Sequence, residues 1–289
     1  MELHRLTQHV YYSDSVSYGD RPVLGLVAGR EATLAVDCGN SPAHAAWLLE
    51  QAAGLGLPPV RWACITHWHW DHVMGGPTLQ EAGASILCGR RTAGQLRALE
   101  GLEWTTEAME NRIADGLEIP FCRDTIREEY PGEDRRLIPP RPQLILDGPG
   151  ELDLGGVTVR LLPHAADHSM DGMLVHIPED RAVFLGDSSY LNMYVSPWHY
   201  TAEKLLPLLD TLEGLAADWY LPAHHDKMLD GPAFREFAAR QRLLCRLAGE
   251  DTVPGAALRR LEDHLGRAPS QEEREELMAF IRGNLVKTR

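Results

Sequence analysis

The stretch that most constrains this chain runs from Ala63 to Gly76 and reads A-C-I-T-H-W-H-W-D-H-V-M-G-G. The residues before the histidines, Val60 to Ile65, are apolar apart from one arginine and predict a buried strand. Four side chains that can bind a metal follow this strand: His67, His69, Asp71 and His72. Side chains two positions apart on an extended chain point the same way, so the first two histidines can share one ion.

Imidazole and carboxylate groups are ligands of first-row metals, and three or more that converge make a site. We therefore predict a metal site at a strand end, with a helix that begins near Val73. The alternative interpretation is a histidine-rich turn exposed to solvent, but surface turns seldom place two tryptophans behind an apolar strand.

The segment T-H-W-H-W-D-H resembles the H-x-H-x-D-H signature of the metallo-β-lactamase superfamily. Further candidate ligands follow in the order that this family uses, each after a strand-like run: His168 in P-H-A-A-D-H-S, Asp187 in V-F-L-G-D-S-S and His224 in W-Y-L-P-A-H-H. The resemblance covers roughly Leu3 to Asp226. It implies an α/β fold in which two packed sheets lie between outer helices, the four-layer αββα sandwich.

The resemblance also implies how the ligands divide between two divalent ions. One ion would lie on His67, His69 and His168. The other would lie on Asp71, His72 and His224, with Asp187 bridging both. This set contains no thiolate, and it suits zinc first, with manganese or iron as alternatives.

The pattern of strands and helices predicts a catalytic domain over residues 1–230 and a C-terminal helical extension over residues 231–289. Leu3 to Tyr12 is predicted to be the first strand and Trp219 to Leu221 the last. Residues 91–142 interrupt the β pattern with three charged and aromatic helices. This insertion is either a lid over the substrate or a solvated excursion that covers the sheet. Its candidate wall residues are Trp104, Phe121 and Tyr130.

Composition limits the partners and the compartment. The chain has 289 residues, of which 44% are hydrophobic and 24% charged, as in globular proteins. Its formal net charge of −14 argues against nucleic acid and anionic membranes as partners. The first residues, M-E-L-H-R-L-T-Q, lack the regions of a signal peptide, and the five cysteines contain no C-x-x-C pair. We expect a cytoplasmic protein that acts on a small molecule and that can form a homodimer.

The ligand set favours hydrolysis of an ester-like bond, a thioester or a lactone, by hydroxide that two metals hold. Asp71 is a candidate for assisting the leaving group. Tyr190 lies three residues after the bridging aspartate, as in the acyl-homoserine lactone lactonases that this segment resembles, and there it would contact the substrate carbonyl. Hydroxyacylglutathione hydrolases are the other branch that the chain resembles. The competing hypotheses are a mononuclear iron persulfide dioxygenase and a non-enzymatic metal-binding scaffold.

Four other polar residues are open to two interpretations each. Asp37 either caps the helix that follows it or supports the ligands from behind. His164 and His199 are candidates for the surroundings of the site. His225 stands where the family usually has a small residue, and it either supports the site or binds substrate.

Overall fold

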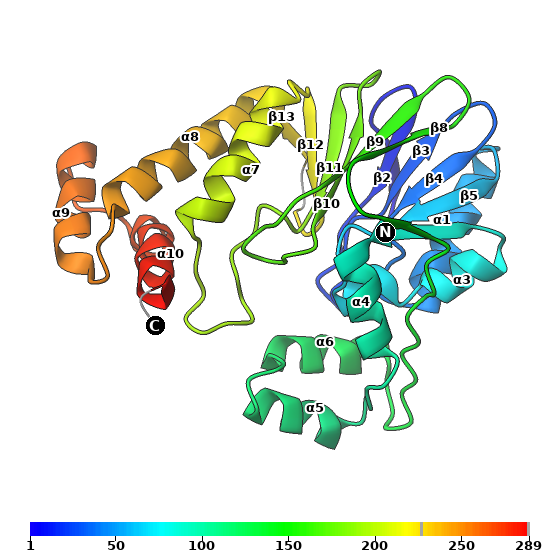
Figure 1. The fold of residues 1–289 in the computed structure, drawn as a ribbon, viewed down its shortest axis with the longest axis horizontal. Helices are drawn as coiled ribbons and strands as arrows, with labels where there is room; N and C mark the ends of the chain where they lie inside the picture. The colour runs from blue at the N-terminus through cyan, green and yellow to red at the C-terminus, as the bar shows by residue number, and fades with distance from the viewer. Residues whose placement is uncertain (226–227, 288–289) are drawn as a thin grey trace.

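The computed structural model describes residues 1–225 and 228–287, which form two β-sheets between layers of helices (Figure 1). The first sheet has the strand order β1-β2-β3-β4-β5-β6-β7. Its strands are β1 (Leu3–Arg5), β2 (Val10–Ser13), β3 (Gly25–Ala28), β4 (Thr33–Val36), β5 (Val60–Cys64), β6 (Ser85–Gly89) and β7 (Leu144–Leu146). Strands β4 to β7 run parallel, so their carboxyl ends meet at one edge.

The second sheet has the order β13-β12-β11-β10-β9-β8. Its strands are β8 (Gly150–Asp153), β9 (Thr158–Pro163), β10 (Met173–Ile177), β11 (Ala182–Gly186), β12 (Trp219–Pro222) and β13 (Leu229–Asp230). Strands β11 and β12 are parallel, and the remaining pairs are antiparallel.

Two predicted strands need correction. The expected single strand over Leu3 to Tyr12 is divided into β1 and β2, because the amides of Leu6 and Thr7 turn back to donate to the carbonyl of Val10. The strand at Trp219 is also not the last, since β13 pairs with it in antiparallel register.

The helices surround the sheets on both sides. They are α1 (Pro42–Gly54), α2 (Trp70–Val73), α3 (Gly76–Glu81), α4 (Arg90–Leu99), α5 (Thr106–Ala114), α6 (Pro120–Glu129), α7 (Ala202–Gly214), α8 (Gly231–Ala248), α9 (Pro254–Leu265) and α10 (Gln271–Lys287). The first of them starts at Pro42, with the Ser41 hydroxyl accepting from the amide of His44. Asp37 is therefore not the cap of this helix.

Three apolar clusters hold four layers together. Val36 and Leu87 of the first sheet pack against Val175 and Phe184 of the second. A second cluster joins the outer face of the first sheet to α1 and α3, and a third joins the second sheet to α7 and α8. Figure 1 shows this αββα arrangement, with α4 to α6 extending to one side of it. The fold class expected from the sequence is confirmed.

The C-terminal helices are continuous with the core of the second sheet. Leu185 of β11 belongs to the same buried cluster as Phe234 of α8 and Phe280 of α10. The division at residue 230 remains a prediction about domains, although both parts share this core. None of the helices within residues 1–225 and 228–287 has the length and apolar character needed to cross a membrane.

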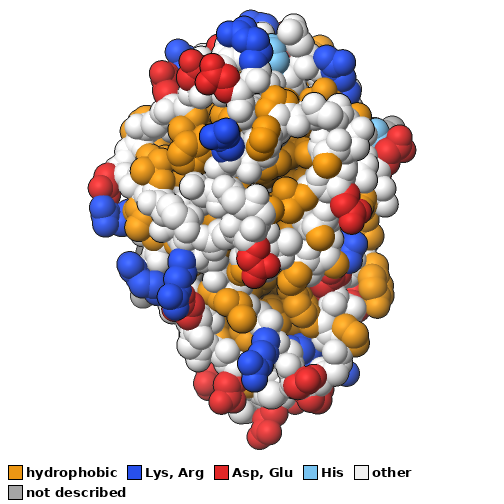
Figure 2. Space-filling view, turned by 90° about the vertical axis from the view of Figure 1, so that its right-hand side faces the viewer, with side chains coloured by type: hydrophobic (Ala, Val, Ile, Leu, Met, Phe, Trp, Pro, Cys, Tyr) orange, Lys and Arg blue, Asp and Glu red, His pale blue; other side chains and the backbone are white. Residues whose placement is uncertain are grey.

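One end of the molecule's long axis is formed by the first sheet and its helices (Figure 2). Figure 2 shows hydrophobic side chains across the middle of this end and charged side chains mostly nearer its outline. Scattered exposed apolar groups are ordinary on a protein surface. The homodimer expected from the sequence therefore stays a prediction.

Candidate metal centre

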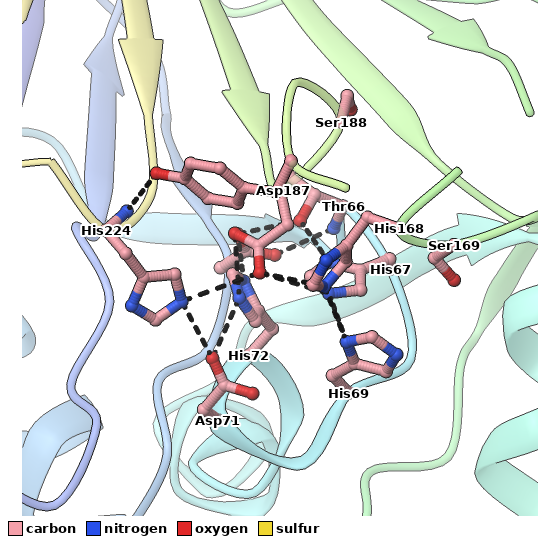
Figure 3. A network of polar contacts seen from close by, with 12 residues as sticks. Thr66, His67, His69, Asp71, His72, His168, Ser169, Asp187, Ser188 and His224 are labelled. Carbon is pink, nitrogen blue, oxygen red and sulfur yellow. Dashed lines mark hydrogen bonds and ion pairs between the residues drawn. The ribbon is translucent and has the colours of Figure 1, made fainter. Parts of the chain in front are cut away.

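The seven candidate ligands all lie just beyond strand ends, at one edge of the two sheets (Figure 3). The first sheet supplies four of them after β5, two in the loop and two in α2: His67, His69, Asp71 and His72. The second sheet supplies the others after β9, β11 and β12: His168, Asp187 and His224. The two sheets thus bring together residues that are far apart in the sequence.

One group consists of three imidazoles and one carboxylate. The Nδ1 atom of His69 lies 3.0 Å from Nε2 of His67 and 3.0 Å from Nε2 of His168. The Oδ2 atom of Asp187 lies 3.1 Å from Nε2 of His168 and 3.7 Å from Nε2 of His67. These four side chains can therefore offer ligand atoms to a single ion.

The other group shares the same aspartate. Nε2 of His72 lies 2.9 Å from Oδ2 of Asp71, and Nε2 of His224 lies 3.1 Å from that same oxygen. Asp187 directs Oδ1 toward His72 at 3.5 Å and Oδ2 toward His224 at 3.6 Å. The structure therefore places Asp187 between two ligand groups, where one carboxylate can touch both.

Hydrogen bonds behind the histidines fix which nitrogen faces the centre. Asp37 accepts from Nδ1 of His72 at 2.8 Å and also from the amide and hydroxyl of Thr66, at 2.7 and 2.9 Å. The Thr66 oxygen lies 3.2 Å from Nδ1 of His67, and it can accept because its own hydrogen goes to Asp37. Asp37 thus supports the ligands from behind and leaves both Nε2 lone pairs facing the centre.

Two further contacts orient the ligands of the second sheet. Nδ1 of His168 lies 3.3 Å from the carbonyl of Leu191, to which it can donate. Nδ1 of His224 lies 3.3 Å from Oδ1 of Asp20, which comes from the loop before β3. Each ring therefore keeps Nε2 for the centre, as metal-binding histidines do when a partner holds the other nitrogen.

The donor set fits metal ions better than it fits hydrogen bonding alone. With His67 and His168 protonated on Nδ1, their Nε2 atoms both direct lone pairs at Nδ1 of His69. That nitrogen can donate a hydrogen to at most one of them. Nε2 of His72 faces Oδ2 of Asp71 at 2.9 Å, but the ring hydrogen is on Nδ1, so no hydrogen lies between these two atoms. Among the described residues, this nitrogen and Oδ1 of Asp187 are buried without a hydrogen bond. Buried polar atoms are usually paired, so these atoms fit a site that cations complete.

The surroundings shift the histidine pKa values in opposite directions in the two ligand groups. Burial, followed by the neighbouring imidazoles, lowers the pKa of His67 and His69 well below the ordinary value, which keeps both rings neutral. Burial would raise the pKa of Asp187, but His224, His72 and His168 outweigh it and lower that pKa. Burial would lower the pKa of His224, but nearby carboxylates raise it to about 9. The carboxylates are therefore held as anions, and the raised pKa of His224 reflects a local excess of negative charge that divalent cations would offset.

A cavity of about 380 Å³ opens over the two groups. Tyr190 lines it, and its hydroxyl oxygen accepts a hydrogen bond of 3.0 Å from the amide of His224. Burial, then the charge of Asp187, raises the pKa of Tyr190, so the phenol keeps its proton. The ring of His225 stacks on that of Tyr190, with centroids 5.7 Å apart. The O–H of Tyr190 can therefore donate into the cavity.

The insertion reaches the cavity through α6, but only part of the expected wall lies there. Phe121 lines the cavity, together with its neighbours Ile119 and Cys122. Trp104 is instead packed in the core of the first sheet, where it is 4% exposed, and the Tyr130 hydroxyl donates to the carbonyl of Asn40. The expectation that both aromatics face the substrate is wrong.

The other histidines singled out in the sequence lie apart from the two groups. Both ring nitrogens of His164 are buried without a partner among the described residues, and its ring packs against Gly172. His199 is buried and uses Nδ1 to bond the carbonyl of Pro197. Two residues that line the cavity, Asp20 and Tyr194, were not singled out in the sequence. Neither residue belongs to a motif, so no signal in the sequence marks them.

Comparisons with known proteins agree with this architecture. A family model described as the metallo-beta-lactamase superfamily matches residues 21–224. A comparison with curated protein sequences finds no match.

Solved structures with this fold include proteins from several bacteria. A metallo-beta-lactamase family protein from Thermus thermophilus is 21% identical, with a TM-score of 0.60 over 98% of this chain and 95% of that one. A metallo-beta-lactamase from Pontibacter korlensis is 16% identical, with a TM-score of 0.57 over 82% and 97%. A stereoselective inverting sec-alkylsulfatase from Pseudomonas sp. is 13% identical, with a TM-score of 0.66 over 98% and 49%. The family match covers most of the chain, and the chain therefore belongs to the metallo-β-lactamase superfamily as an enzyme of the hydrolase type.

Proposed function

We propose that the protein is a metal-dependent hydrolase of an ester-like bond, with a thioester or a lactone as substrate and zinc as the metal. The observation that supports this most strongly is the pair of ligand groups that share Asp187 beneath a cavity. Two divalent ions bound there would supply hydroxide at neutral pH, because coordination lowers the pKa of water from about 15.7 toward about 7. Manganese and iron also suit these donors.

In this proposal the chain divides its ligands between the two ions. His67, His69 and His168 would hold one of them. Asp71, His72 and His224 would hold the other, with Asp187 shared between the two groups. The hydrogen bonds of Asp37 and Asp20 support this assignment, since they fix the rings that would otherwise rotate away.

Two residues are assigned direct roles toward the substrate. Tyr190 donates its O–H to the carbonyl oxygen, which becomes negative as the tetrahedral intermediate forms. Asp71 assists departure of the leaving group, because its carboxylate belongs to the second ligand group and also lines the cavity. The histidines keep both groups in place and need not move during the reaction.

A substrate panel with reversible metal removal tests the proposal. Zinc-loaded protein should hydrolyse members of a series of thioesters and lactones, lose this activity with a chelator, and regain it with zinc. Phosphodiesters and sulfate esters serve as comparison substrates. Oxygen consumption with a persulfide, together with one iron per chain, would instead support the mononuclear persulfide dioxygenase and contradict the proposal.

A further inference from the structure

The cavity over the ligand groups has two unlike walls. One wall consists of the ligands themselves, together with Asp20 and Tyr190. A second part of the lining is mostly apolar and comes from the start of α6 and the loop after β11: Ile119, Phe121, Cys122, Met193 and Tyr194. Ser15, Val16 and Ser17 complete the lining. A substrate carbonyl placed over the ligands would therefore direct the rest of its acyl group toward an apolar surface.

The apolar wall is anchored to the ligands. The ring of Tyr194 lies against His69, with centroids 4.6 Å apart, and its hydroxyl lies 3.3 Å from Sγ of Cys122 in α6. The amide of Tyr194 donates to Oδ1 of Asn192 at 3.1 Å, which fixes the loop. The wall is thus built into the site.

Contacts at the far end of α6 hold the insertion against the first sheet. Glu129 forms an ion pair of 2.9 Å with Arg21 and accepts from the Ser41 hydroxyl. Tyr130 donates to the carbonyl of Asn40 at 2.8 Å. These bonds fix the end of α6, so Phe121 keeps its position over the cavity.

The charges around the cavity do not suit an anionic acyl group. Of the described residues that line it, the titratable ones are acids, imidazoles, a thiol and phenols, and none is a lysine or an arginine. A carboxylate on the acyl group, away from the metals, would lie against Phe121 and Met193 without a cationic partner. Burying an unpaired charge on apolar side chains is unfavourable.

We propose that the site selects substrates whose acyl group is uncharged and apolar, and that this group lies on Ile119, Phe121, Met193 and Tyr194. The inference rests on the proposed hydrolase function and narrows its substrate class. It separates this site from one that recognises a sulfate, a phosphate or a carboxylate on the acyl side. Phe121 is then a residue that determines specificity.

A matched pair of chromogenic esters tests the proposal in zinc-loaded protein. p-Nitrophenyl hexanoate and the mono-p-nitrophenyl ester of adipate have the same six-carbon chain and differ in a terminal methyl or carboxylate. We expect kcat/KM for the hexanoate to exceed that for the adipate by at least about tenfold, the range that an apolar pocket wall provides. Equal rates, or faster cleavage of the adipate ester, would overturn the inference and leave the hydrolase function standing.

A binding measurement separates this inference from the hydrolase proposal itself. 2-Octanone and 7-oxooctanoate are ketones without a bond to hydrolyse, and calorimetry can compare their affinities. If neither ester is cleaved and the neutral ketone still binds at least tenfold tighter, the wall is confirmed and the hydrolase proposal fails. If neither ester is cleaved and the ketones show no such difference, both proposals are overturned.

Two arginine variants localise the effect. Phe121 is 47% exposed, so Phe121→Arg can fold while it places a cation at the wall. This variant should reduce the ratio of kcat/KM for the hexanoate to kcat/KM for the adipate about tenfold. Leu117 is 70% exposed in the same insertion but lies outside the cavity lining, so Leu117→Arg should keep the preference. A preference unchanged in Phe121→Arg, or narrowed equally in both variants, would contradict the role of the wall.

Discussion

At the scale of residues, the centre depends on acids that are not ligands themselves. Asp37 adopts a φ of 63°, an uncommon value for a residue other than glycine, and holds Thr66 and His72 from that position. Asp20 acts on His224 in the same way. These contacts fix rings whose Nε2 atoms must face the metals. Residues well outside the histidine motif therefore hold the ligand rings in position.

Asp37→Asn should weaken metal binding by about 10- to 100-fold. The amide keeps the size of the side chain but loses the charge, and it presents a donor where three donors already converge. Competition with a chromogenic chelator measures the change. Asp180→Asn is the matched control, because it alters a histidine–aspartate contact with His9 away from the centre, 2.8 Å long. Equal metal affinities in the two variants would show that Asp37 does not support the ligands.

Tyr190→Phe should lower kcat by roughly tenfold to a thousandfold with metal content unchanged. The reason is that its hydroxyl accepts from the amide of His224 and so keeps its hydrogen for the developing oxyanion. Steady-state kinetics with elemental analysis checks this. An effect on KM alone would place the hydroxyl in ground-state binding, and no effect would leave Tyr190 as a packing residue beside His225.

The sequence identified candidate ligands because the motif is local, whereas the residues behind them were harder to find. His67 to His72 lie within one short stretch, and the later candidates follow recognisable strand ends. Asp20 and His224 are about 200 residues apart in the sequence, and neither the spacing nor the composition of the loop before β3 indicates their contact. Only folding brings these two residues together.

At the scale of elements, the helical insertion shows what a pattern can and cannot predict. Its helices α4, α5 and α6 were expected from the charge and aromatic pattern, and they lie close to the expected range. The direction of the aromatics was not predictable, because Trp104 precedes α5 in a connecting segment without periodicity. Trp104 packs inward, and the Arg112 guanidinium lies 4.9 Å from its ring centroid.

Trp104→Ala should therefore change stability and leave substrate ranking alone. Removing a buried indole from the core costs about 3–5 kcal/mol in the free energy of unfolding. Urea denaturation measures this loss, and relative rates over a series of acyl groups measure selectivity. A variant that keeps its stability but ranks substrates differently would contradict this prediction, because it would show that Trp104 contacts the substrate.

At the scale of the whole molecule, two sheets align their strand ends so that each contributes to both ligand groups. Asp187 from the second sheet stands between His67 and His72 from the first, at 3.7 and 3.5 Å. The αββα fold thus makes the centre an interlayer site, and the core between the sheets fixes its geometry. The C-terminal helices extend the core of the second sheet, a packing that helical periodicity in the sequence could not place.

The most direct test of the central claim is the number of metal ions per chain, measured by elemental analysis after zinc loading and desalting. We expect two ions in the unaltered protein. We expect at least one fewer in a folded Asp187→Ala variant, whose two cations lose the anion that screens their repulsion. One ion per chain in the unaltered protein after full loading, or two retained ions with full activity in Asp187→Ala, would contradict the shared-aspartate centre.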